Sequence, residues 1–199
     1  MSRTSASPIR VAKRQEVYRG RQLAVVREEL EIAGHRVVRE TIQHPGSAVI
    51  VPVRPDGRLV FVRQYRRAIG RSLLELPAGT LDHGPESALA CAKRELEEET
   101  GWRASRWSRL GWFYPAPGFL SERMTMFLAS GLRAAAAHPE PDEFVTPVAL
   151  TWTQAQSAVR TGRICDAKSI IGLLFAARRL GRVRRVDTAR ERRGAVTAQ

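Results

Sequence analysis

The chain has 199 residues, a formal net charge of +13 and a hydrophobic content of 43%. This length and this mixture of apolar and charged residues predict one folded core and exclude an intrinsically disordered chain. The longest apolar runs, such as residues 170–177, are far shorter than the roughly 18–20 residues that cross a bilayer, so no membrane partner is expected. Cys91 and Cys165 form neither a disulfide framework nor a metal-binding spacing, which favours a cytoplasmic protein.

The first part of the sequence predicts strands. The first fourteen residues are rich in Ser and Arg, and we expect a tail there rather than a transit peptide. Residues 17–31 and 35–43 are typical of a hairpin around Ala33-Gly34. Two further strands, 47–53 and 59–64, are apolar and β-branched, and the Asp56-Gly57 pair between them favours a tight turn.

The second part predicts helices and strands together. Residues 86–100 have the apolar spacing of a helix, with Leu89, Ala92 and Leu96 on one stripe. Strands, a Pro-rich loop and two helices follow at 105–114, 123–132, 134–147, 153–161 and 166–180. This order predicts an α+β fold or an α/β/α sandwich rather than regular βαβ alternation.

The predicted helix ends in a cluster of glutamates that is unexpected in so basic a chain. Residues 93–102 have the sequence KRELEEETGW. Helical spacing places Glu95, Glu98 and Glu99 together, where each like-charge pair costs roughly 0.2–0.5 kcal/mol. The negative end of the helix dipole lies there too, because Gly101 is typical of a C-cap. Something outside the helix is therefore expected to compensate the charge.

Two interpretations of this cluster remain open on the residues alone. The glutamates could form a solvated acidic face, or they could hold Mg²⁺, with Mn²⁺ as a substitute, because carboxylates on a rigid helix supply hard oxygen ligands. Zinc is disfavoured, since no set of Cys and His residues accompanies them. Arg94 is expected to pair with Glu98 one turn later and to hold it in place.

The sequence leading into this helix, AGTLDHGPESALACAKRELEEETGW, resembles the Nudix box. The box requires a glycine, a glutamate and then a glutamate-rich helix that ends in glycine and an apolar residue. These positions are filled by Gly79, Glu86, Arg94, Glu95, Leu96, Glu98, Glu99, Gly101 and Trp102. The chain departs from the pattern at one point, because six residues instead of five separate Gly79 from Glu86. The role of Glu86 is left open for this reason.

Segments outside the box resemble the ADP-ribose pyrophosphatase branch of the family. They are VRQYRRAIGRSLLELPAGTLD, YPAPGFLSER, PDEFVTPVAL and GRICDAKSIIGLLFAARRL. The resemblance implies a Nudix-type α/β/α sandwich with a mixed sheet, over residues 46–181. It also implies a small N-terminal antiparallel β-subdomain, within residues 1–45, that makes contacts in a homodimer.

The resemblance also implies a mechanism and its residues. Glu95 and Glu99 would ligate Mg²⁺ together with the backbone carbonyl of Ala78, and Glu98 would ligate or orient. Glu143 would act as the general base or complete the metal shell, with Glu140 as a weaker candidate. Arg66 and Pro117 would contact the substrate, a nucleoside diphosphate derivative. The aromatic partner of its base is left open among Trp112, Tyr114 and Phe119.

The resemblance implies hydrolysis of ADP-ribose to AMP and ribose 5-phosphate, and two alternatives remain. One is another nucleoside diphosphate derivative, such as a nucleotide sugar, a dinucleoside polyphosphate or an oxidised nucleotide. The other is a nucleic-acid-directed protein that uses the C-terminal tail, residues 182–199, where arginines are concentrated. A tail of this kind is more typical of a solvated segment than of a nucleic-acid site, because no aromatic residues are interleaved with the arginines.

Overall fold

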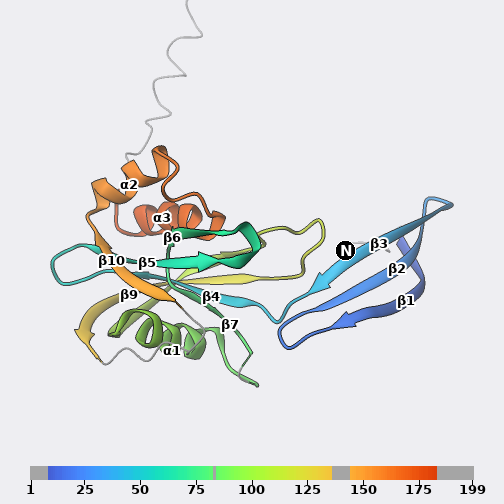
Figure 1. Cartoon of the computed structure of the whole chain (residues 1–199), viewed down its shortest axis with the longest axis horizontal. Helices are drawn as coiled ribbons and strands as arrows, with labels where there is room; N and C mark the ends of the chain where they lie inside the picture. The colour runs from blue at the N-terminus through green and yellow to red at the C-terminus, as the bar shows by residue number, and fades with distance from the viewer. Residues whose placement is uncertain (1–8, 83, 136–143, 183–199) are drawn as a thin grey trace, which may run out of the picture.

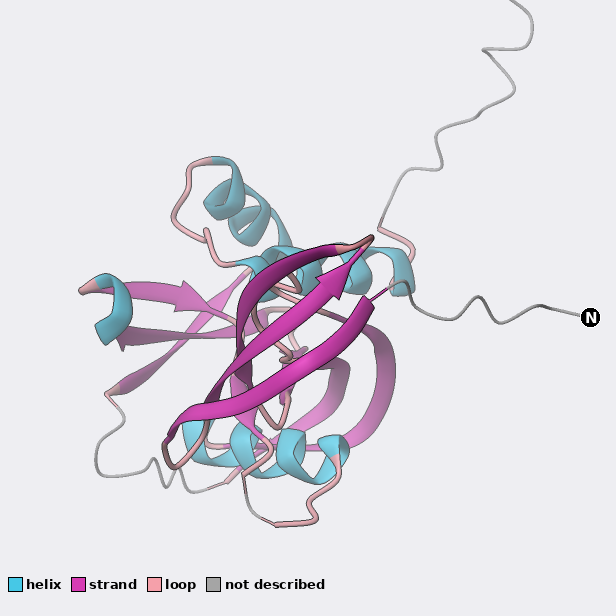
Figure 2. Cartoon of the chain, turned by 90° about the vertical axis from the view of Figure 1, so that its right-hand side faces the viewer, coloured by secondary structure: helices cyan, strands magenta, loops and turns pink. Residues whose placement is uncertain are grey.

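A computed structural model of the chain describes residues 9–82, 84–135 and 144–182 (Figure 1). The first three strands form an antiparallel sheet of their own, with the order β1-β2-β3. They are β1 (Ile9–Arg19), β2 (Ala24–Ile32) and β3 (His35–Gln43). This N-terminal sheet extends to one side of the rest of the molecule in Figure 1, and it faces the viewer in Figure 2.

The remaining strands form two further sheets. A mixed sheet has the order β7-β4-β9-β8, in which β4 and β9 are parallel and the other pairs are antiparallel. An antiparallel sheet has the order β10-β5-β6. The bounds are β4 (Ser47–Pro52), β5 (Leu59–Arg66), β6 (Arg71–Glu75), β7 (Ala78–Thr80), β8 (Trp102–Phe113), β9 (Met124–Ala134) and β10 (Val145–Leu150), with a short 3-10 helix, Arg67–Ile69, after β5.

Helices cover both sides of this pair of sheets. In Figure 1, α1 (Ala88–Thr100) lies below the strands, and α2 (Trp152–Arg160) and α3 (Ala167–Arg179) lie above them. Strand β4 is buried on both faces, because Val49 and Val51 pack in the core beneath α2 and α3, while Ala48 and Ile50 pack in the core beneath α1. The predicted α+β fold, with a mixed sheet between helices and antiparallel strands at the N-terminus, is confirmed.

The structure corrects three details of the prediction. Strand β1 begins at Ile9, inside the segment expected to be a tail, because its backbone pairs along the length of β2. Strand β10 begins at Val145 and continues through Pro147, which lies in the expected loop. An edge strand tolerates proline because one row of its backbone groups needs no partner. In α1, Leu89 is exposed, and Cys91 packs in the core instead.

Two other expectations concern the domain bounds and the C-terminal tail. The division of the chain at residues 45 and 181 stays a prediction, and the basic tail from residue 183 lies outside the described residues. Within the residues that are described, no helix is long and apolar enough to cross a membrane.

Candidate active site

Helix α1 is fixed at both ends and along its buried face. At its start, the side-chain oxygen of Ser87 accepts a hydrogen bond from the backbone N–H of Ala90 at 3.2 Å. At its end, Gly101 adopts a φ of +67°, and its N–H donates to the carbonyl of Glu97. Ala92 and Leu96 are fully buried against β4 and β9. Because these contacts set the rotation of the helix, they also set where its glutamates lie.

Glu95 and Glu99 lie on the inner side of α1, against strand β7. Glu95 is only 7% exposed to solvent, and Glu99 is only 3% exposed. The Oε2 of Glu99 accepts a hydrogen bond from the backbone N–H of Ala78 at 3.2 Å. Glu95 packs so closely on Gly79 that a Cβ atom there would lie 1.8 Å from Oε1 of Glu95. The motif therefore needs glycine at position 79, because any side chain there would displace the carboxylate of Glu95.

Arg94 supplies much of the charge compensation from within α1 itself, whereas compensation was expected from outside the helix. Its Nη1 donates to Oε1 of Glu95 at 2.7 Å and to Oε2 of Glu98 at 2.8 Å, which confirms the predicted pair with Glu98. Its Nη2 lies 3.3 Å from Oε2 of Glu86. Burial tends to lower the pKa of Arg94, but the hydrogen bond to Glu86 and the charges of Glu95 and Glu98 raise that pKa above its ordinary value. The guanidinium is therefore always charged and joins three carboxylates.

The extra residue before Glu86 does not prevent Glu86 from reaching the helix. The contact between Glu86 and Arg94 is made even though six residues separate Gly79 from Glu86. Glu97 points away from this cluster and pairs with Arg103, its Oε2 accepting from Nε at 2.6 Å. The four glutamates of the helix thus divide into three that face the site and one that does not.

A polar cavity of about 220 Å³, here called the glutamate cavity, opens beside these carboxylates. Acidic and basic groups line it together, so it suits a ligand with phosphate groups and a cation. Its lining comes from the turn before β2, from β5, β7 and α1, and from the loop after β7. The lining residues are Gln22, Gln64, Arg66, Ala78, Gly79, Thr80, Asp82, Arg94, Glu95 and Glu98. Five of the site residues predicted from the sequence therefore line this one cavity: Arg66, Ala78, Arg94, Glu95 and Glu98.

Arg66 is positioned by a buried ion-pair cluster that the sequence analysis did not identify. Glu75, which is 1% exposed, accepts from Nη2 of Arg66 at 2.6 Å and from Nζ of Lys168. Lys168 also donates to Oδ2 of Asp166 at 3.1 Å. The lone glutamate in the apolar segment LLELP was the signal in the sequence, because a charge in a buried strand requires a partner.

This cluster predicts acid sensitivity of the fold. Burial alone would raise the pKa of Glu75, but the Arg66 hydrogen bond and the Lys168 charge outweigh burial and lower it below the ordinary 4.5. A carboxylate whose pKa is lower in the folded state stabilises the protein above pH 4.5, and this stability is lost as the pH falls through the folded pKa. We expect Glu75→Gln to lower the free energy of unfolding by about 3 kcal/mol at pH 7, because two cations lose a buried partner.

The measurement is urea denaturation followed by circular dichroism at several pH values. The difference between wild type and Glu75→Gln should shrink as the pH falls from 4.5 toward the lower folded-state pKa of Glu75, where the wild-type carboxylate becomes protonated. Glu29→Gln is the matched control, because Glu29 is 54% exposed and its nearest cation, Nζ of Lys13, is 3.9 Å away. Equal stability of Glu75→Gln and wild type at pH 7 would contradict the role of the cluster.

The carboxylates have the ligand chemistry that a hard divalent cation prefers. Glu95 and Glu98 line the cavity, and Glu99 lies one turn from Glu95 beside Ala78. Oxygen ligands of this kind suit Mg²⁺ or Mn²⁺. In the described residues, however, no group of three or more His, Cys, Asp or Glu side chains is arranged to hold a metal ion. The guanidinium of Arg94 lies between Glu95 and Glu98 instead, so metal ligation by these glutamates and by the Ala78 carbonyl stays a prediction.

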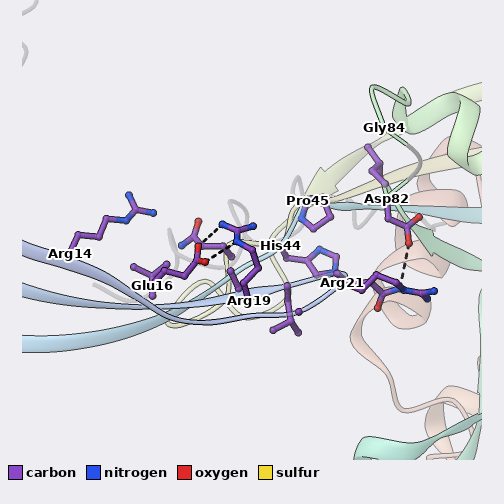
Figure 3. Close-up of a pocket in the computed structure, with 15 residues that line it drawn as sticks. Arg14, Glu16, Arg19, Arg21, His44, Pro45, Asp82 and Gly84 are labelled. Carbon is purple, nitrogen blue, oxygen red and sulfur yellow. Dashed lines mark hydrogen bonds and ion pairs between the residues drawn. The ribbon is translucent and has the colours of Figure 1, made fainter.

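A larger cavity of about 550 Å³ adjoins the glutamate cavity, and Gln22 and Asp82 line both of them. Nε2 of Gln22 donates to Oδ2 of Asp82 at 3.4 Å, which links the N-terminal sheet to the loop after β7. Figure 3 shows Arg14 and Arg19 of β1 on one side of this larger cavity and Asp82 on the other. The two cavities together provide room beside the carboxylates for a ligand longer than a diphosphate.

Other predicted residues lie away from these cavities or outside the described residues. Pro117 is in the turn after β8 and lines neither cavity, and Trp112, Tyr114 and Phe119 line neither of them. The turn itself is held by Ile42, whose N–H donates to the carbonyl of Phe119 at 2.7 Å. Glu143 and Glu140 lie outside the described residues, so the predicted roles of these two glutamates and of Pro117 stay predictions.

A family model, several relatives and a solved structure are similar to this chain. The model of the NUDIX domain matches residues 43–170. The methanol dehydrogenase activator of Bacillus methanolicus is 33% identical over 82% of this chain and 89% of its own length. The ADP-ribose pyrophosphatase of Bacillus subtilis (strain 168) is 32% identical over 81% of this chain and 89% of its own length. The crystal structure of an ADP compounds hydrolase superposes with a TM-score of 0.78 at 24% identity, over 90% of this chain and 99% of that one.

Proposed function

This chain belongs to the NUDIX domain family, and from that premise we propose that it hydrolyses the pyrophosphate bond of ADP-ribose, releasing AMP and ribose 5-phosphate. The observation that carries the proposal is the glutamate cavity, where Arg66, Arg94, Glu95 and Glu98 lie together next to a larger cavity. The ADP-ribose pyrophosphatase of Bacillus subtilis among the relatives supports the choice of substrate.

Hydrolysis of a pyrophosphate requires that charge on the phosphate oxygens is neutralised and that a water is placed in line with the bond. Family members use a divalent metal ion, and Mg²⁺, or Mn²⁺ in its place, would supply charge neutralisation and a lowered water pKa when held by Glu95, Glu98, Glu99 and the carbonyl of Ala78. Arg66 provides a guanidinium that binds phosphate oxygens, and Glu75 fixes its orientation. Arg94 holds Glu95 and Glu98 in place.

A general base is needed to take a proton from the attacking water, and we propose Glu143 for this role. Glu143→Gln should lower kcat for ADP-ribose by about 10²-fold or more, with only a modest change in KM, because general-base catalysis acts on the transition state. Steady-state kinetics test this, with Glu140→Gln measured in parallel, because Glu140 is the weaker candidate for the same role. Wild-type kinetics of Glu143→Gln would assign the base to another residue.

The experiment that tests the substrate is product analysis by chromatography. The purified full-length protein is incubated with Mg²⁺ and ADP-ribose, and in parallel with nucleotide sugars, dinucleoside polyphosphates and nucleoside triphosphates. Preferred release of AMP and ribose 5-phosphate is the expected result. Preferred cleavage of another compound would show that Arg66 and Pro117 are not markers of ADP-ribose. If no compound is cleaved, the proposed activity is wrong.

We also propose that the protein is a homodimer in the cytoplasm and that its N-terminal sheet makes the dimer contact. Every residue of β1 is exposed, including the apolar Val11, Val17 and Tyr18, which are at least half exposed. Light scattering after gel filtration should therefore give twice the chain mass of 22.2 kDa. A monomeric mass at micromolar concentration would contradict the dimer but not the hydrolase.

A further inference from the structure

A basic and aromatic groove lies between β8 and the C-terminal end of α3, apart from the two cavities of the candidate active site. Its volume is about 520 Å³. Arg109 and Trp112 of β8 line one side, and Phe175, Arg178 and Arg179 of α3 line the other. Among the described residues no acidic residue lines it, and none of its lining residues lines the glutamate cavity or the larger cavity beside it. We call it the arginine groove.

The local structure of β8 explains how the groove is formed. Strand β8 is the edge of the mixed sheet, and its pairing with β9 shifts register between Arg109 and Gly111. Leu110 packs on the core, whereas Arg109 and Trp112 are exposed. A Cβ atom on Gly111 would lie 2.9 Å from the ring of Phe175, so the glycine allows α3 to approach the strand closely. The bulge and the glycine therefore place an arginine and a tryptophan beside the arginines of the helix.

The charges of the groove are available to a ligand. Arg109, Arg178 and Arg179 make no ion pair within the described part of the chain. Trp112 is 48% exposed, and one edge of its ring packs against Tyr114, with the ring centroids 5.4 Å apart. A partly exposed ring that is held in place offers a stacking surface at a low cost in side-chain entropy. The groove therefore combines cations that can bind phosphate with a surface that can stack on a base.

We propose that the arginine groove binds single-stranded nucleic acid, with phosphates on Arg109, Arg178 and Arg179 and a base stacked on Trp112. Binding of this kind uses a basic groove that follows the backbone and aromatic rings on which bases stack. A free nucleotide has the same chemistry, but three guanidinium groups exceed what one monophosphate needs, and a strand supplies a phosphate at every nucleotide. The net charge of +13 favours the same polyanionic partner.

The test measures the binding of a fluorescein-labelled single strand of about twelve nucleotides to the full chain by anisotropy at several salt concentrations. Arg109→Gln should weaken binding about tenfold and reduce the slope of log K against log salt by about 0.7, because one phosphate contact is lost. Arg163→Gln is the matched control, because Arg163 is an exposed arginine in the connection between α2 and α3. It should bind as the wild type does.

Substitution of Trp112 separates stacking from charge. Trp112→Ala should weaken binding of the strand about tenfold but leave binding of inorganic polyphosphate, which has no bases, unchanged. Trp112→Phe keeps a ring and should retain most of the affinity, and it also serves if the alanine variant fails to fold, as judged by its thermal unfolding. Wild-type affinity in both Arg109→Gln and Trp112→Ala would show that the strand binds elsewhere, such as the C-terminal arginines, and would overturn the proposal.

Two further results would overturn it as well. Equal affinity for a mononucleotide and for the strand would make the groove a site for a free nucleotide. If the wild type does not bind the strand at low salt, the groove would have another partner, such as an acidic surface of a second copy of the chain. None of these outcomes bears on hydrolysis of ADP-ribose, because no residue of the groove, including Trp112, lines either cavity of the candidate active site.

Discussion

Glu99→Gln is expected to lower kcat for ADP-ribose by about 10²–10³-fold while the chain stays folded. Glu99 is 3% exposed, and its carboxylate accepts from the backbone N–H of Ala78 at 3.2 Å. Glutamine has the same shape, and its amide oxygen can accept that hydrogen bond. The substitution therefore removes the negative charge and a proposed metal ligand but keeps the packing between α1 and β7.

The matched control for this variant is Glu97→Gln, two positions earlier on the same helix. It makes the same change of charge, but Glu97 pairs with Arg103, whereas Glu99 contacts Ala78, which lines the glutamate cavity. Steady-state kinetics over a range of Mg²⁺ concentrations, together with thermal unfolding, should give wild-type values for Glu97→Gln and a loss of turnover only for Glu99→Gln. Full activity of Glu99→Gln would contradict the assignment of Glu99 as a metal ligand.

The parts of the site that were predicted from the sequence are those set by local rules. Helix α1 ends at Thr100 with Gly101 as its C-cap, as the Thr-Gly pair indicated. The pair between Arg94 and Glu98 follows from their spacing of four residues, since that spacing places side chains together on a helix. The division between the glutamates that face the site and Glu97 follows from the same periodicity. These features depend on neighbours within one or two turns, so the sequence contains them.

The parts that were not predicted depend on contacts between distant segments. Lys168 is 93 residues from Glu75, and no local pattern indicates that the two pair beneath Arg66. Gln22 reaches Asp82 across 60 residues, from the turn before β2. The arginine groove forms only because the bulge in β8 and the C-terminal end of α3 lie next to each other. Such sites arise from the packing of elements, which the order of elements alone does not determine.

The motif glycine gives the second large expected effect, because Gly79→Ala should lower kcat about a hundredfold. A Cβ atom at position 79 would lie 1.8 Å from Oε1 and 1.9 Å from Cδ of Glu95, so the carboxylate has to move. Glu95 is 7% exposed and is held by Arg94 at 2.7 Å. A shift of Glu95 therefore disturbs Arg94 and Glu98 as well, and misplacement of a catalytic group by about 1 Å is enough to cost a hundredfold in rate.

Gly172→Ala is the control that separates crowding of the site from crowding in general. A Cβ atom at position 172 would lie 2.4 Å from Leu76 and 2.8 Å from Met126, both in the core beneath α3. This variant should lose about 1–3 kcal/mol of stability but keep the kcat of the folded fraction, since overpacking a core does not move the carboxylates. Gly79→Ala should differ, because its folded fraction should have a kcat about a hundredfold lower, whatever stability the variant loses. If the two variants lose activity in proportion to their loss of stability, Gly79 is needed only for folding, and the close contact with Glu95 has no part in catalysis.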